Sequence, residues 1–180
     1  MTLANPSAVL LEIVTALTAL RLPVDPYGAD VAAFDKIKIF DLQDLARAME
    51  ELFLYSNRIA LIGLDSVGHE NLISGRTLKT ARSLDVTLIL ADRRYSDRQK
   101  ALMGDATTPG ALLLQKLVVD GLAGELPSGA IVQPGTGRLV ALENEKRKDE
   151  TGRILFAQDF TLNTSWAAES LTRAAKVPAT

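Results

Sequence analysis

The chain has 180 residues, of which 47% are hydrophobic and 23% are charged, a composition typical of one globular domain. It contains no cysteine, which excludes disulfide bonds, thiolate nucleophiles, and zinc or iron–sulfur sites with cysteine ligands. Twenty lysines and arginines against 22 aspartates and glutamates give a net charge of −2. We therefore expect no broad electrostatic attraction to DNA or to an anionic membrane.

The N-terminal segment predicts an amphipathic helix. Asn5 and Pro6 form a helix-start signature. An apolar stripe then recurs at helical spacing, at Leu10, Ile13, Val14, Leu17 and Leu20. Glu12 and two threonines interrupt the stretch, so we expect neither a signal peptide nor a membrane span, and a soluble protein made in the cytoplasm. Two prolines and a glycine predict an extended, turning connection over residues 21–28.

The middle of the chain predicts two strands after a helix. Residues 36–40 alternate between charged and apolar and indicate a short strand or a lead-in to the helix predicted at 41–55. The β-rich run 58–64 predicts a buried strand, and the glycine-flanked stretch 67–75 predicts a mobile loop. Residues 77–92 carry a period-two pattern, which predicts a half-exposed antiparallel strand.

The second half of the chain predicts a helix and a hairpin. Thr108 as the cap and Pro109 at the first helical position predict a helix that Gly124 ends. Residues 129–137 read as a turn-rich link, and apolar runs at 139–142 and 154–166 predict a hairpin with a charged tip. Gln158 interrupts the apolar face of that hairpin, which indicates a bulge or a position at the rim.

This order of elements predicts an α+β fold. We expect a mainly antiparallel sheet of four to five strands with helices packed on one face, in two layers. Residues 1–166 form a single domain in this prediction. Residues 167–180 are either a short helix or a C-terminal tail that becomes ordered only on assembly.

The sequence offers no constellation of catalytic residues. The single histidine, His69, lies beside Glu70 in a polar stretch and reads as a solvated residue. Carboxylate pairs such as Glu50–Glu51 are adjacent in sequence and point in different directions. We therefore predict no catalytic residue, no cofactor, no metal site and no enzymatic activity. A small enzyme with a carboxylate site stays open as an alternative.

Two basic segments are candidates for contacts with other molecules. The cluster at 93–100 is a nucleic-acid site, a solvated loop or a protein contact. The segment 143–153 balances acids and bases and is either solvated or lies on a neighbouring subunit. The residues that we predict as assembly contacts are Arg93, Arg94, Tyr95, Arg98, Lys100, Lys146, Arg147 and Lys148.

The order of these elements resembles a family of phage proteins. The features are the amphipathic N-terminal helix, the strand 59–64, the long strand 84–90 running into Asp92-Arg93-Arg94, the helix 109–122, and the final pair 139–166 with Trp166 near its end. From about Ala8 to Trp166, the chain resembles the tail terminator, or tail-completion, proteins of Mu-like and other long-tailed bacteriophages. It departs from them in the helix 41–55 and the tail 167–180.

The resemblance implies a structural protein of the virion tail, assembled in the bacterial host cytoplasm. Such a protein forms a homohexameric ring that caps the tail tube, ends tube polymerisation and presents a surface for joining the head. The implied partners are other copies of the chain, the tail tube protein and the head–tail connector protein. DNA would pass through the ring only as cargo, and no membrane is involved. The alternatives are a head–tail connector (neck) protein and a small DNA-binding accessory protein.

Overall fold

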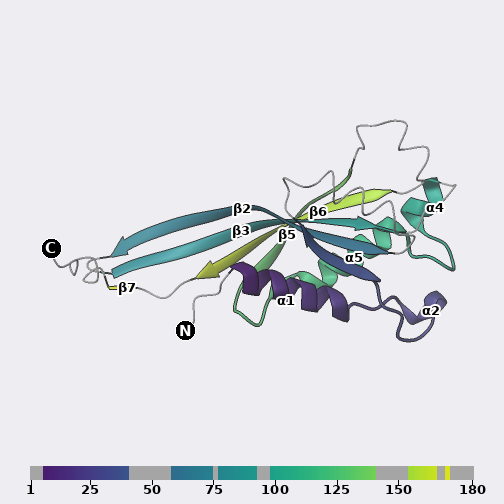
Figure 1. The fold of residues 1–180 in the computed structure, drawn as a ribbon, viewed down its shortest axis with the longest axis horizontal. Helices are drawn as coiled ribbons and strands as arrows, with labels where there is room; N and C mark the ends of the chain where they lie inside the picture. The colour runs from purple at the N-terminus through teal and green to yellow at the C-terminus, as the bar shows by residue number, and fades with distance from the viewer. Residues whose placement is uncertain are drawn as a thin grey trace.

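A twisted sheet with a long projecting hairpin dominates the molecule (Figure 1). The computed structural model describes residues 6–40, 58–74, 77–92, 98–140, 154–165 and 169–170. The helices within these residues are α1 (Pro6–Ala19), α2 (Val24–Tyr27), α4 (Arg98–Met103) and α5 (Gly110–Leu122). The strands are β1 (Lys36–Phe40), β2 (Ile59–Ser74), β3 (Thr77–Ala91), β4 (Gly124–Glu125), β5 (Ile131–Leu139), β6 (Leu155–Ser165) and β7 (Glu169–Ser170).

The sheet has the strand order β1-β2-β3-β6-β5-β4, and β7 pairs with the far end of β3. β1 runs parallel to β2, and every other strand pair in the described residues is antiparallel. The predicted α+β class is therefore confirmed. The sheet is larger than the predicted four to five strands and is mixed, because the short segment 36–40 became a parallel edge strand.

The main core lies between the sheet and two helices. α1 and α5 each bury one apolar stripe against the same cluster of strand side chains, which includes Leu84, Val86 and Leu88 of β3. The predicted period-two face of β3 and the stripe of the first helix are thus confirmed. Each of these buried aliphatic side chains contributes about 1.5–3 kcal/mol relative to an exposed position.

The other face of the sheet also buries apolar side chains. Phe40, Ile59, Leu61, Ile89, Ala91 and Leu155 form a second, smaller cluster. Ile89 lies on the side of β3 that the period-two pattern predicted to be solvated, but it is buried. The sheet therefore buries an apolar cluster on each of its two faces.

Several loop predictions are wrong because strands extend through glycines. Residues 67–74, predicted as a loop, continue β2, and the segment 129–137 contributes most of β5. The connection 21–28 contains the one-turn α2. The predicted helix 41–55 lies outside the described residues, as do most of the residues of the predicted tail 167–180.

Gln158 is buried opposite an irregularity in its partner strand. The β5–β6 register shifts between Pro134 and Gly137, and Gly137 lies opposite Gln158. The Gln158 side chain accepts a hydrogen bond from Gln115 Nε2 (2.7 Å) and donates to the carbonyl oxygen of Gly135 (3.1 Å). The predicted bulge is present, but it lies in β5. Gln158 forms a hydrogen bond with a backbone group that the bulge exposes.

The N-terminus of α5 is capped from a distant strand. Thr108 was the predicted cap, but the amide of Gly110 donates to Asp92 Oδ2 (2.7 Å), a carboxylate that follows β3 and is almost fully buried. Gly110 has a φ of +72°, and a Cβ there would lie 2.3 Å from the backbone nitrogen of Gly104. Glycine is thus required at this crossing between α4 and α5.

Within the described part of the chain, no helix combines the length and the apolar character needed to cross a membrane.

Candidate functional site

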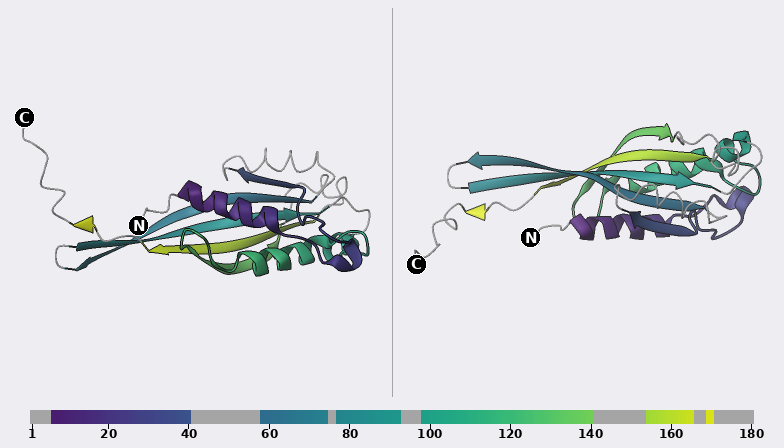
Figure 2. Two further views of the ribbon diagram at one scale, coloured as in Figure 1. Left: turned by 90° about the horizontal axis from the view of Figure 1, so that it is seen from below. Right: turned by 45° about the horizontal axis from the view of Figure 1, so that its top comes forward.

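The body is the part of the molecule built around the main core, and the far half of the β2–β3 hairpin projects from it, with Leu84 at its base still buried in that core. We call Ser66–Ser74 of β2 and Thr77–Asp85 of β3 the arm. The two strands pair continuously from Ser66 with Asp85 to Ser74 with Thr77. The arm extends away from the helices in each view (Figures 1 and 2). At about 3.3 Å per residue, it is about 30 Å long.

The two edges of the arm are covered differently. On the β3 side, β6 pairs as far as Ala81, and β7 pairs with Thr77 and Leu78. On the β2 side, β1 pairs only as far as Gly63. From Leu64 to Ser74, β2 therefore has no strand partner among the described residues, and we call this stretch the open edge.

The opposite edge of the sheet is protected in a way that the open edge is not. There, β4 covers only Ile131 and Val132 of β5, and the uncovered part of β5 contains Pro134 and the bulge. Proline and bulges are the usual means by which proteins prevent an edge strand from pairing with another chain. The open edge has one register shift, between Leu64 and Ser66, and from Ser66 to Ser74 it has neither a further shift nor a proline.

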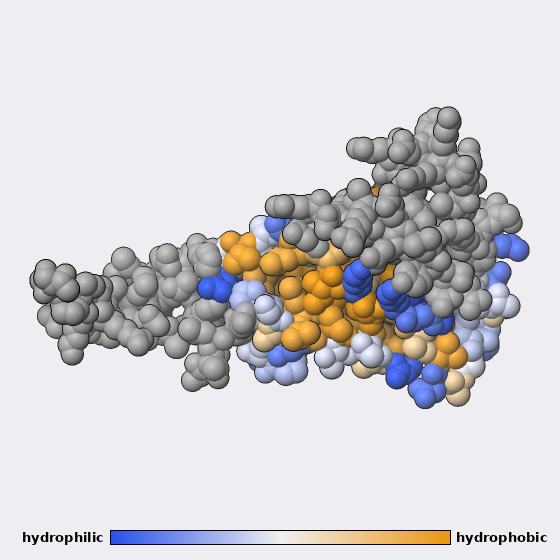
Figure 3. Space-filling model, viewed as in Figure 1, coloured by the Kyte–Doolittle hydropathy of each residue, from blue (hydrophilic) through white to orange (hydrophobic). Residues whose placement is uncertain are grey.

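Apolar side chains gather where the arm leaves the body. α1 packs against β1, and β1 ends beside Gly63, next to the start of the open edge. Figure 3 shows apolar surface, in orange, over this middle part of the molecule. Leu11 is 59% exposed, Ile39 is 40% exposed and Val67 is 39% exposed. We call these three residues, together with the half-buried Val14, Ile37 and Leu64, the arm-base patch.

Hydroxyl and carboxylate groups connect four strands across the opposite face of the sheet. Thr87 Oγ1 lies 2.5 Å from Asp65 Oδ2 and 2.7 Å from Asp159 Oδ1. Arg138 of β5 forms an ion pair with Asp159. One hydroxyl proton can be donated to only one of the two carboxylates at a time, so the guanidinium is the main compensation for the charge of Asp159.

A second set of hydrogen bonds holds the root of the arm. Ser66 donates to Asp85 Oδ2 across the β2–β3 pair (2.6 Å), and Thr161 of β6 donates to Asp85 Oδ1 (3.0 Å). Asp85 therefore joins three strands at the point where the arm begins. This network fixes the direction in which the arm leaves the body.

Two groups at the corner before α5 have shifted pKa values. The side chains and amides of Thr107 and Thr108 donate to Asp105 Oδ1, at 2.7–3.1 Å. These hydrogen bonds lower the pKa of Asp105 to about 2. Burial, and then the charges of Asp105 and Asp92, raise the pKa of Tyr27, whose hydroxyl donates to the carbonyl oxygen of Asp105. The groups stabilise a loop, and each has a structural partner.

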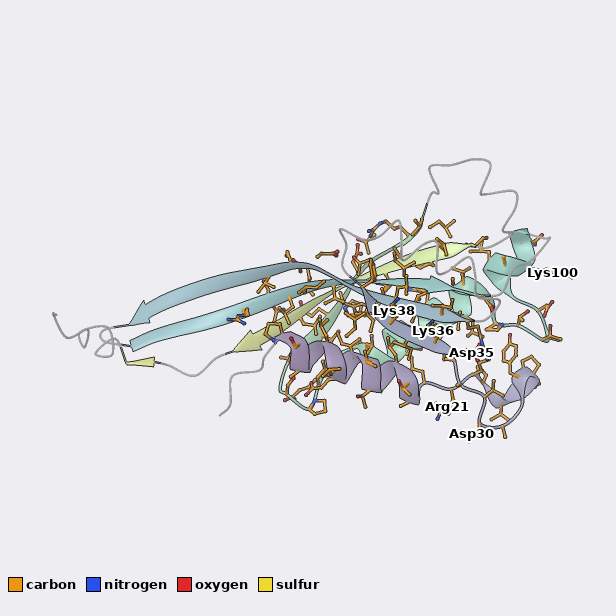
Figure 4. All side chains as sticks on the ribbon, viewed as in Figure 1. Arg21, Asp30, Asp35, Lys36, Lys38 and Lys100 are labelled. Atoms are coloured by element: carbon orange, nitrogen blue, oxygen red, sulfur yellow. The ribbon has the colours of Figure 1, made fainter. Side chains whose placement is uncertain are left out.

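The structure places only part of the predicted assembly contacts. Arg98 begins α4, and Lys100 is exposed in the same helix. Lys100 lies at the end of the molecule far from the arm (Figure 4). Arg93, Arg94, Tyr95, Lys146, Arg147 and Lys148 lie outside the described residues.

The sequence does not predict the arm, because His69 and the glycines around it favour a loop. A usable signal lay at its end, where Gly75-Arg76 separates two runs containing Leu72, Ile73 and Leu78. A Gly-X pair between β-forming runs is a signature of a two-residue hairpin connection. Ser74 pairs with Thr77, so the connection does have two residues.

Neither a scan against protein-family models nor a search of the curated proteins finds a match to this chain. In the part of the chain that the structure describes, no group of three or more histidine, aspartate and glutamate side chains is arranged to hold a metal ion.

Proposed function

We propose that this protein is a structural subunit of a phage tail that assembles into a ring, of the tail-terminator type. The ring would cap the tail tube, end its polymerisation and present the surface to which the head-side connector binds. The observation that carries the proposal is the arm, a long strand pair with an open edge.

Among the described strands, only β6 and β7 support the arm from the side. A two-stranded hairpin is at best marginally stable in water unless another element packs on it. An open edge also presents unpaired backbone groups to any strand that can reach it. Keeping an open edge from Leu64 to Ser74 is an advantage when the arm binds another subunit.

A ring needs two different surfaces on each subunit. In a cyclic assembly, one patch of a subunit meets a different patch on the next, and the rotation closes the ring. The arm and the arm-base patch are two such surfaces on one chain. The resemblance in the order of elements to tail terminators supports a ring at the end of a tail tube, which is hexameric in that family.

The proposed partners are other copies of the chain, the tail tube protein and the head–tail connector protein. DNA would pass through the ring as cargo. Arg93, Arg94, Tyr95, Arg98, Lys100, Lys146, Arg147 and Lys148 remain proposed contacts with these partners. In this proposal the protein works in the virion tail, without a catalytic site, a cofactor or a membrane.

The test is to delete the gene and to measure tail length by negative-stain electron microscopy. For a terminator, we expect tubes that are overlong or variable in length and carry no heads. Tails of normal length beside filled, separate heads would instead identify a head–tail connector. Normal infectious particles would overturn both assignments.

Complementation makes this test specific to the arm. The wild-type gene on a plasmid should restore normal tail length. A gene with a shortened arm should not, although its product folds. If the shortened-arm gene restores normal tails, the arm is not the feature through which the protein acts.

A further inference from the structure

We propose that the open edge binds an extended peptide segment in which apolar residues alternate with lysine or arginine. The segment would pair with β2 from Leu64 onward, in line with β1, and would add a strand to the sheet. This inference rests on the proposed function, because it states which kind of segment the arm binds in a neighbouring protein of the tail.

The backbone direction of β2 is set where β1 pairs with it. The carbonyl oxygen of Arg58, the residue before β2, accepts a hydrogen bond from the first amide of β1 (3.3 Å). Backbone groups alternate in direction along a strand, so those of Ile62 also point toward the side of β1. Ile62 stands opposite Leu88 of β3.

The same direction holds for Val67, beyond the end of β1. Opposed residues of an antiparallel pair direct their backbone groups either toward each other or both outward. Leu84 lies four positions before Leu88 in β3, has the same orientation and stands opposite Val67. The N–H and C=O groups of Val67 therefore point to the open edge, where an extended main chain can pair with them.

β1 shows which side chains suit a strand at this edge. It alternates lysine with isoleucine, at Lys36, Ile37, Lys38 and Ile39 (Figure 4). Ile37 packs against the main core, whereas the two lysines stand opposite residues of the second cluster, on the other face. A segment that continues the row of β1 meets the same two faces of the sheet.

The apolar face continues beyond β1. Val67 is exposed and stands opposite Leu84 of the main core, so it lies on the same face as Ile37. The half-buried Leu64 packs against that core as well. Apolar side chains at alternate positions of the bound segment would cover Leu64, Val67 and the exposed Ile39.

The other face carries carboxylates where the open edge begins. Asp65 is exposed and accepts from Thr87, and Asp85 accepts from Ser66 and Thr161. Neither carboxylate forms an ion pair with a described residue. Basic side chains on this face of the bound segment would complement the two charges, whereas a nucleic acid or an anionic lipid would be repelled.

Fluorescence anisotropy with labelled synthetic peptides tests the pattern on the full-length protein. The probe consists of four Val-Lys repeats. One control consists of four Val-Glu repeats, and the other has four valines followed by four lysines, which keeps the composition without the alternation. We expect the probe to bind about tenfold more tightly than either control. Equal binding of all three peptides would overturn the proposal, as would binding of none.

Val67→Pro tests whether the main chain of the peptide pairs with the edge. Proline removes the outward N–H and leaves the pairing of β2 with β3 in place. Leu139→Pro is the control at the opposite edge of the sheet, since the next amide, of Val140, donates to β6 and that of Leu139 points outward.

Both proline variants should keep the wild-type thermal midpoint. Val67→Pro should weaken binding of the Val-Lys probe by about tenfold, and Leu139→Pro should leave it unchanged. A folded Val67→Pro protein that binds the probe as tightly as the wild type would overturn strand pairing at the open edge.

Asp65→Asn tests the charge in a variant whose side chain still accepts a hydrogen bond from Thr87. The preference for the Val-Lys probe over the Val-Glu peptide should fall by about threefold. Asp120→Asn, at an exposed carboxylate of α5, should leave the preference unchanged. The same preference in both variants and in the wild type would overturn the selection of basic residues by Asp65.

The peptide assay and the tail assay fail separately. If the wild type binds no peptide but forms oligomers that Val67→Pro dissociates, the open edges of two copies pair with each other and the proposed segment is wrong. Absence of peptide binding together with abnormal tails in the deletion strain overturns this inference alone. Selective peptide binding together with normal infectious particles supports the inference and overturns the proposed function.

Discussion

At the scale of single residues, Gln158 shows how a polar group is accommodated inside the core. It is 1% exposed, and its side chain bonds to Gln115 and to the backbone of the β5 bulge. Replacing it with leucine keeps the volume but leaves these buried groups without their partner. The polar residue thus allows the bulge in β5.

We expect Gln158→Leu to lower the free energy of unfolding by about 1–3 kcal/mol, measured by urea titration. The control is Gln133→Leu, at an exposed position of β5, which should change the stability by less than about 0.5 kcal/mol. A Gln158→Leu protein as stable as the wild type would show that water can replace the side chain at the bulge.

Asp105 predicts a pH dependence whose sign follows from its lowered pKa. The folded protein holds the pKa at about 2, below the ordinary value of 3.8. The contribution of Asp105 to stability is therefore fully present above about pH 4 and is lost as the pH falls from about 4 to about 2. Asp105→Ala should destabilise the protein at neutral pH, and the difference from wild type should shrink over this window. Urea midpoints at a series of pH values measure it; a difference that stays constant to about pH 2 contradicts the assignment.

At the scale of elements, the arm is separable from the body. β6 pairs with β3 only as far as Ala81, and His69 pairs directly with Arg82. Replacing residues 70–81 with Asn-Gly should therefore close a shorter hairpin with a favourable two-residue turn.

The shortened variant should keep the thermal midpoint of the wild-type monomer and lose the ability to form oligomers. Circular dichroism and native mass spectrometry measure the two properties. Replacing only Gly75-Arg76 with Asn-Gly preserves the length of the arm and serves as the control. Loss of folded protein in the shortened variant alone would place part of the core's stability in the arm.

Elements with a strong local pattern were predictable, and elements defined by distant partners were not. The apolar stripe of α1 and the alternation in β3 depend on the residues of those segments alone. The parallel pairing of β1 depends on β2, and the cap of α5 depends on Asp92, a residue that is 18 positions away. The arm also depends on a distant partner. Gly68 and His69 weaken the strand pattern of β2, and the pairing with β3 maintains the strand there.

At the scale of the molecule, the body and the arm should differ in local stability. Residues 84–91 of β3 lie between β2 and β6, whereas the open edge has a partner on one side only among the strands that the structure describes. In the monomer, peptides from 66–74 should exchange amide hydrogens faster than peptides from 84–91. Hydrogen-exchange mass spectrometry measures this, and assembly should slow exchange in the arm. Equal protection in the monomer would contradict the independence of the arm.

The candidate site combines surfaces that the sequence separates. Leu11, Ile39 and Val67 come from three elements and meet because α1 packs on β1 and β1 pairs with β2. Sequence reasoning sought contacts in charged clusters, since charge is visible in a linear sequence. An apolar patch formed from single residues on separate elements has no such local signature.

The register of the β2–β3 hairpin also has a consequence for synthesis. Its strands are joined by two residues, so they can pair as soon as Ala91 has left the ribosome, whereas β6 begins only at Leu155. Local contacts form fastest in folding. Throughout the synthesis of the intervening chain, β3 lacks its β6 partner, so the nascent hairpin exposes the edge of β3 in addition to the open edge of β2. This interval is when neighbouring nascent chains are most prone to aggregate, and it ends when β6 covers the edge of β3.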